Sequence, residues 1–176
     1  MQLHRGNLFL VGMPGCGKST LGRLLARRLN KAFYDADAEL ERRLGVSIPL
    51  IFELEGEPGF RDREEAVLDD LVALTNVVLS TGGGAVLRSA NRGRLSQGGT
   101  VLYLHAPPGT LWERTRRSKH RPLLQAADPL ARLRELYEMR DALYREVADL
   151  VVESDREQVS RLAHRLEQQL RAAARA

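Results

Sequence analysis

The sequence has little cysteine, few aromatic residues and no long hydrophobic run. Its 176 residues include one cysteine, Cys16, so no disulfide can form within the chain, and we expect a protein of a reducing compartment, the cytoplasm. The N-terminus has no apolar stretch long enough for a signal peptide or a membrane span, so we expect no membrane partner. Aromatic residues make up 5% and do not alternate with basic ones, which argues against a base-stacking nucleic-acid surface.

Charge is abundant and nearly balanced. Charged residues make up 28% and hydrophobic residues 43%, values typical of a globular chain, and the length fits one domain with a core. The net charge is +4, with 27 Lys and Arg against 23 Asp and Glu. A positive balance fits a nucleic acid, or an anionic small substrate with a nucleotide. Acidic and basic residues interleave along 39–43, 132–145 and 156–171, a pattern typical of solvated, ion-paired helix faces.

Short apolar runs alternate with segments of helical period. We expect strands at about residues 7–11, 32–34, 77–80, 100–104 and 150–152. This alternation predicts an α/β fold in which helices cover both faces of a parallel sheet. No internal repeat divides the chain, so we expect one domain over residues 1–176.

Two connections are longer than a minimal strand–helix alternation requires. Residues 38–74 are long enough for several helices, with Ser47 as a cap and a break at 57–59 before a helix that begins near Phe60. Residues 116–128 are rich in Arg, Lys and His and have little periodicity. Such a basic loop is a candidate lid, and its alternative is an ordinary surface loop.

Residues 12–19 match the phosphate-binding loop pattern, in which two glycines with four residues between them precede Lys18 and Ser19. A strand is expected before the loop and a helix after it, the context in which the pattern marks a site. The glycines let backbone N–H groups curl around an anion at the positive end of the helix. Lys18 would neutralise phosphate charge, and the Ser19 hydroxyl would help to hold Mg²⁺. For Cys16, a small side chain that fits the loop is favoured over a nucleophile.

Two carboxylates follow the second expected strand. If the chain is still extended there, Asp35 and Asp37 point to the same side, at the carboxyl end of a strand where open α/β sheets bind ligands. One could hold Mg²⁺ through water while the other takes a proton or binds a hydroxyl. Taken alone, both residues are equally typical of turns and caps.

Two further motifs have a functional and an ordinary interpretation. Arg61 and Glu64 are neighbours on one helix face, where the arginine could grip a carboxylate while the glutamate holds it; taken alone, a surface ion pair is favoured. Residues 81–84, Thr-Gly-Gly-Gly, follow the third expected strand. They allow the backbone to approach a ligand closely, or form a flexible turn.

Several arginines could bind anions. Arg121 lies in the candidate lid, whose closure would bring it onto a transferred phosphoryl group. Arg140 lies on a helix expected over about 129–144. Arg114 and Arg117 are candidates for phosphate or adenine contacts, with surface charge as the favoured alternative for Arg117.

Taken together, these motifs resemble the shikimate kinase family over about residues 8–152. The matching elements are an ATP loop at 12–20, an Asp-x-Asp motif at 35–37, a substrate element at 60–64, a triple glycine at 82–84, a lid arginine at 121 and a second arginine at 140. The resemblance implies the three-layer αβα fold of P-loop NTPases, with a five-stranded parallel sheet of order 2-3-1-4-5, substrate-binding helices and a lid. It also implies ATP-dependent phosphorylation of the 3-hydroxyl of shikimate, on the route to chorismate and the aromatic amino acids.

The resemblance also implies a role for each site residue. Asp37, Lys18 and Arg121 are the implied catalytic residues. ATP would contact Gly15, Cys16, Gly17, Lys18, Ser19, Thr20, Arg114 and Arg121; Mg²⁺ would be held by Ser19 and Asp35; shikimate would contact Asp37, Arg61, Gly82, Gly83 and Arg140. We expect a monomer, because no heptad or apolar stripe indicates a dimer.

Two other functions remain open at this stage. A gluconate kinase shares the loop and fold group, but the triple glycine and the Arg61 element disfavour it. A nucleotide-binding regulator or nucleic-acid-associated ATPase fits the basic charge, but the candidate lid and the missing aromatic platform disfavour it.

Overall fold

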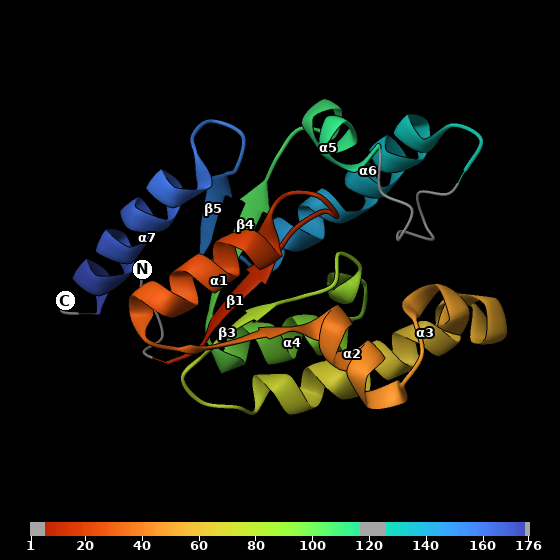
Figure 1. Ribbon diagram of the computed structural model, residues 1–176, viewed down its shortest axis with the longest axis horizontal. Helices are drawn as coiled ribbons and strands as arrows, with labels where there is room; N and C mark the ends of the chain where they lie inside the picture. The colour runs from red at the N-terminus through yellow and green to blue at the C-terminus, as the bar shows by residue number, and fades with distance from the viewer. Residues whose placement is uncertain (1–5, 117–125, 175–176) are drawn as a thin grey trace.

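The computed structural model describes residues 6–116 and 126–174, which form a parallel sheet between two layers of helices (Figure 1). The strands are β1 (Leu8–Val11), β2 (Ala32–Asp35), β3 (Val77–Ser80), β4 (Thr100–His105) and β5 (Leu150–Glu153). The helices are α1 (Lys18–Leu29), α2 (Ala36–Leu44), α3 (Ile48–Val72), α4 (Ser89–Gly98), α5 (Pro108–Thr115), α6 (Pro129–Val147) and α7 (Val159–Ala173), with a 3₁₀ turn, η1 (Ala85–Leu87). The predicted strands are confirmed to within about one residue at their ends.

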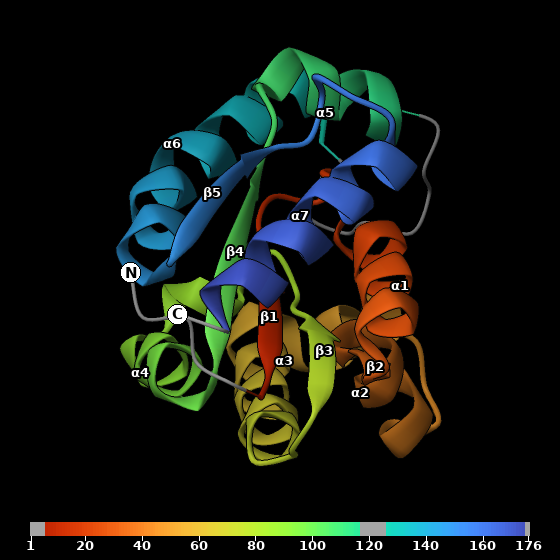
Figure 2. The same ribbon diagram turned by 90° about the vertical axis from the view of Figure 1, so that its left-hand side faces the viewer.

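The strand order is β2-β3-β1-β4-β5, with every neighbouring pair parallel. Figure 2 shows the five strands in this order. The central strands β1 and β3 are buried at every residue, whereas the edge strands β2 and β5 are partly exposed. This agrees with their sequences, because a strand covered on both faces is apolar throughout. The predicted α/β fold and sheet order are confirmed.

Helices cover both faces of the sheet. The helices α1 and α7 pack side by side on one face (Figure 2), and α3, α4 and α6 pack on the other. The core between the layers contains the apolar residues of the central strands, such as Phe9, Leu10 and Leu102, which have no exposed surface. No described helix is both long and apolar enough to span a membrane.

The interleaved charges lie on solvated helix faces, as predicted. On α2, Glu39 accepts two hydrogen bonds from Arg42 and one from Arg43, and these bonds lower the pKa of Glu39 to about 2. Arg165 and Arg171 of α7 pair in the same way with Glu157 and Glu167. These exposed pairs contribute little to stability individually, and they leave the basic residues of these faces partly neutralised.

The long connection after β2 contains α2 and α3, and the break within it was predicted at the wrong residues. Ser47 caps α3, since its hydroxyl accepts from the N–H of Leu50 at 3.4 Å. The break is at Gly56, which has φ 69° and ψ −176°, and not at 57–59. The helix restarts at once, because Pro58 then lies in a first turn, where its missing N–H is not needed. This restart gives Arg61 and Glu64 their helical spacing.

Candidate active site

The phosphate-binding loop connects β1 to α1, as predicted. Gly15 and Gly17 have φ 85° and 97°, left-handed values that favour glycine. Lys18 is the first residue of α1, and its buried ammonium donates to the carbonyls of Gly12 at 2.7 Å and Met13 at 3.0 Å. The loop thus holds a cation next to the N-terminus of a helix, which is a favourable place for phosphate oxygens.

Asp35, the last residue of β2, forms a hydrogen bond with the residue that follows Lys18. Its carboxylate accepts a hydrogen bond from the Ser19 hydroxyl and caps α2 through the N–H of Ala38 at 3.1 Å. The strand ends at Asp35 and α2 begins at Ala36, so the premise of an extended chain through Asp37 was wrong. Both carboxylates still line one cleft, because the first turn of α2 carries Asp37 there.

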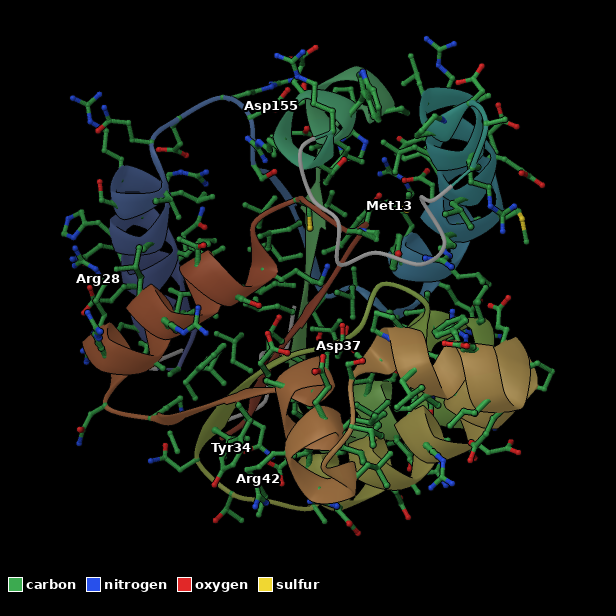
Figure 3. The ribbon with its side chains drawn as sticks, turned by 45° about the vertical axis from the view of Figure 1, so that its right-hand side comes forward. Met13, Arg28, Tyr34, Asp37, Arg42 and Asp155 are labelled. Atoms are coloured by element: carbon green, nitrogen blue, oxygen red, sulfur yellow. The ribbon has the colours of Figure 1, made fainter. Side chains whose placement is uncertain are left out.

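Asp37, labelled in Figure 3, lies at the start of α2. Burial, together with the negative charges of Glu64 and Asp35, raises the pKa of its carboxyl to about 7 against the opposing effect of Lys18 and Arg61. Among the described residues, none donates a hydrogen bond to this carboxyl. A carboxyl with such a pKa and no hydrogen-bond donor is suited to accept a proton near neutral pH.

Arg61 and Glu64 are buried in the cleft, with 7% and 3% of their surfaces exposed, so they are not the surface ion pair that the sequence alone favoured. Their side chains meet at 2.8 Å, and Glu57 binds the other edge of the guanidinium at 3.1 Å. Burial raises the pKa of Glu64, while the charge and hydrogen bond of Arg61 lower it. The two glutamates orient Arg61 and offset its charge.

Arg140 of α6 is the second buried arginine of the cleft, with 2% of its surface exposed. In contrast to Arg61, no carboxylate within the described ranges is close enough for an ion pair with it. Its Nε atom is buried without a hydrogen-bond partner. A buried cation without an anionic partner is costly, so this position is suited to an anionic ligand.

The triple glycine after β3 provides space rather than unusual backbone angles, since none of its residues has positive φ. A side chain at Gly82 would meet the Glu64 carboxylate at 2.6 Å and that of Asp37 at 2.9 Å, and one at Gly84 would overlap the guanidinium of Arg61. The triple glycine was predicted to let the backbone approach a ligand closely. In the structure it also lets the acidic and basic side chains of the cleft approach the backbone. Only glycine lets them reach this loop.

Arg114 of α5 lies near the phosphate loop. Its guanidinium donates to the carbonyls of Cys16 at 3.4 Å and Ser154 at 3.0 Å, which joins the loop to the segment after β5. Cys16 itself does not line the cleft: its thiol is buried, and its N–H donates to Met13 at 3.2 Å. A nucleotide contact from Cys16 therefore stays a prediction. Arg117 and Arg121 lie outside the described residues.

These elements enclose a cleft of about 540 Å³. The predicted residues that line it are Gly15, Gly17, Lys18, Ser19, Thr20, Asp35, Asp37, Arg61, Gly82, Gly83, Arg114 and Arg140. The cleft also has an apolar wall of Ile48, Phe52 and Phe60, in which the rings of Phe52 and Phe60 are 4.6 Å apart. Phe60 belongs to the predicted substrate element at 60–64, whereas Ile48 and Phe52 were not predicted as site residues. Spacing by four residues indicates that Ile48 and Phe52 share a face, but nothing local indicates that this face borders a ligand.

Known proteins with similar sequences and structures share one description. The profile of the shikimate kinase family matches residues 14–171. A shikimate kinase of Nitrosospira multiformis is 58% identical over 165 residues, covering 94% of this chain and 85% of that protein. One of Neisseria gonorrhoeae is 57% identical over 168 residues, covering 94% of this chain and 99% of that protein.

The solved structure of a shikimate kinase from Acinetobacter baumannii in complex with shikimate superposes with a TM-score of 0.92. It is 46% identical and covers 95% of this chain, which in turn covers 93% of that protein. These matches do not favour a gluconate kinase or a nucleotide-binding regulator. The chain belongs to the shikimate kinase family.

Proposed function

We propose that this chain transfers the γ-phosphoryl group of ATP to the 3-hydroxyl of shikimate, giving shikimate 3-phosphate and ADP. The observation that carries the proposal is the convergence of Asp37, Arg61 and Arg140 on one cleft with the phosphate loop. A phosphate loop alone does not choose an acceptor. A carboxyl of raised pKa beside two buried arginines suits a small hydroxylated acid.

Asp37 would receive the proton of the attacking hydroxyl. The hydroxyl oxygen forms a bond to the γ-phosphorus, the bond from that phosphorus to the oxygen shared with ADP breaks, and the O–H proton passes to the carboxylate of Asp37. A pKa of about 7 makes the carboxylate a better base than an ordinary aspartate while leaving much of it ionised near neutral pH.

The donor side would be held by the phosphate loop. Lys18 and the N–H groups at the start of α1 would neutralise the phosphates, and Arg114 would contribute to the nucleotide site from α5. Arg121 would complete this side from the lid. In such transfers catalysis is mostly positioning and charge stabilisation.

Ser19 and Asp35 would hold Mg²⁺. Their hydroxyl and carboxylate oxygens already meet in a hydrogen bond, and hard oxygen donors of this kind fit the ion, which also uses phosphate oxygens and water. When bound, Mg²⁺ neutralises charge on the phosphates. Asp35 would therefore bind the metal and also cap α2, the helix that carries Asp37. One residue would thus link Asp37 to the ATP side of the cleft.

The shikimate carboxylate would be gripped by Arg61 and Arg140. Glu57 and Glu64 pair directly with Arg61 and offset its charge, whereas Arg140 forms no ion pair within the described residues and only feels the charge of Glu64 at longer range. Arg140 would therefore supply most of the attraction. The Gly83 N–H would bind a ring hydroxyl, next to Gly82. All of these residues come from one chain, which supports a monomeric enzyme, and the buried single thiol suits a reducing cytoplasm.

A coupled assay of ADP release tests the proposal. The enzyme is given ATP and Mg²⁺ with shikimate, with gluconate, or with no acceptor. We expect turnover that depends on shikimate, and formation of shikimate 3-phosphate by mass spectrometry. Equal ADP release with and without shikimate would refute the proposal.

A further inference from the structure

The hydroxyl of Tyr144 lies where three segments of the cleft meet. Tyr144 is on α6, one turn after Arg140, and its side chain has no exposed surface. Its O–H donates to the carbonyl of Gly83 in the triple glycine, and the sulfur of Met13, labelled in Figure 3, lies 3.7 Å from the same oxygen. One hydroxyl thus contacts the triple-glycine loop and the phosphate loop from the helix that carries Arg140.

The triple glycine needs this contact because its own hydrogen bonds are incomplete. The carbonyl of Gly82 accepts from the N–H of Ala85, and that of Gly84 accepts from the N–H of Leu87, both at 3.1 Å. The carbonyl of Gly83, between them, is held by the Tyr144 side chain. Glycine has more backbone freedom than any other residue, so the central peptide would be the least restrained without Tyr144.

The tyrosine is itself firmly placed. Its ring packs against that of Tyr103, with centroids 4.9 Å apart. Burial raises the pKa of Tyr144, with the charge of Arg140 as an opposing influence, so the hydroxyl stays protonated and remains a donor at working pH. The hydrogen bond therefore links Gly83 to the helix that carries Arg140.

We propose that Tyr144 is a positioning residue that sets the Gly83 peptide against Arg140 and thereby determines the affinity for the acceptor. The proposal rests on the proposed function, in which Gly83 and Arg140 hold opposite parts of shikimate. It assigns Tyr144 no contact with substrate. Its effect belongs to the acceptor side, because its hydroxyl donates to Gly83 and reaches only the side-chain sulfur of Met13, whereas the donor-side cation Lys18 is held by the backbone carbonyls of Gly12 and Met13.

The test is Tyr144→Phe, with Tyr103→Phe as the matched control. Tyr103 is also buried, and its hydroxyl donates to Asp141 at 2.7 Å, so both substitutions remove one hydroxyl and one hydrogen bond from the same stacked pair. We expect Tyr144→Phe to raise the KM for shikimate roughly tenfold, the factor that one lost hydrogen bond produces. The KM for ATP should stay within about twofold, and Tyr103→Phe should change neither constant by more than that.

Two results would overturn the proposal: a shikimate KM in Tyr144→Phe equal to that of Tyr103→Phe, or a parallel rise in both KM values. If Tyr144→Phe does not fold, 3-fluorotyrosine at position 144 takes its place. It is nearly isosteric and a stronger O–H donor, so the shikimate KM should fall, and an unchanged value overturns the proposal. Wild-type enzyme without shikimate-dependent turnover would instead refute the proposed function.

Discussion

Replacing Asp37 by asparagine should make the enzyme more stable while nearly abolishing its activity. The folded state raises the pKa of this carboxyl from 3.8 to about 7, so it binds the proton more tightly than the unfolded chain does. Stability from this group is therefore fully present below pH 3.8 and is lost as pH rises towards 7. Asparagine has the same shape and carries no charge, so Asp37→Asn avoids this loss.

The size of the effect follows from the pKa shift. Each pKa unit corresponds to about 1.4 kcal/mol, so the ionised carboxylate lowers the free energy of unfolding by up to about 4 kcal/mol at pH 8. For a chain of this length, that converts to a rise of up to about 10 °C in the unfolding midpoint of Asp37→Asn. At pH 4 the difference between variant and wild type should be close to zero. Turnover should fall by roughly 10²-fold to 10⁴-fold, the usual loss of a general base.

Denaturant unfolding of both proteins at pH 4, 6 and 8 measures this difference, and the ADP-release assay measures turnover. Asp155→Asn is the control, because Asp155 is an exposed carboxylate after β5 (Figure 3), and this variant should have nearly the same unfolding free energy as wild type at each of the three pH values. A stability gain in Asp37→Asn that does not grow between pH 4 and pH 8 would refute the assigned cause. Wild-type turnover in the variant would refute the role of Asp37 as the base.

Four further predictions test other parts of the cleft. In wild type, kcat/KM for shikimate should rise with pH and level off above about 7, because Asp37 must be ionised to accept the proton; a flat profile from pH 5 to 8 would contradict this. Arg140→Met should raise the shikimate KM at least about 100-fold yet leave the unfolding midpoint unchanged or higher, since it removes a buried cation that has no ion pair; a large fall in the midpoint would show a structural role. Arg61→Ala should raise the shikimate KM by a similar factor and leave ATP affinity within about twofold of wild type. It should also lower stability, because Glu64 stays buried. Arg63→Ala breaks only an exposed pair with Glu55 and should change neither the shikimate KM, nor ATP affinity, nor stability. Gly84→Ala should raise the shikimate KM by displacing Arg61. Its control is Gly93→Ala in α4, where a Cβ meets nothing within 4 Å; this variant should keep the wild-type KM and stabilise the helix by up to about 1 kcal/mol. Equal KM values for the two variants would contradict the packing role of the triple glycine.

The strands and the phosphate loop were predictable because their signals are local. A buried parallel strand is apolar at every position, as in residues 8–11, and the loop pattern couples glycine geometry to a following helix within a few residues. The break in the helix after Ser47 was predicted at 57–59 instead of Gly56. Pro58 was interpreted as a stop, although proline is tolerated in the first turn of a new helical segment.

For the side chains of the cleft, the sequence identified the residue types but not their environments. Arg61 and Glu64 were typical of a surface pair until α3 packed them beneath the triple glycine. Asp35 and Asp37 reach one cleft through a cap and a helical turn, and not through an extended chain. Tyr144 had no local signal, because its partner Gly83 is 61 residues away in the sequence.

By itself, the sequence determined the α/β architecture, the phosphate loop and the set of acids, arginines and glycines available to a kinase, because each depends on spacing over a few residues. Only the tertiary structure decided their chemistry. Burial beside Glu64 and Asp35 raises the pKa of Asp37 to about 7, and packing gives Arg61 two carboxylate partners while Arg140 has none in the described structure. These properties depend on desolvation and on distances between remote segments, which exist only once the chain has folded.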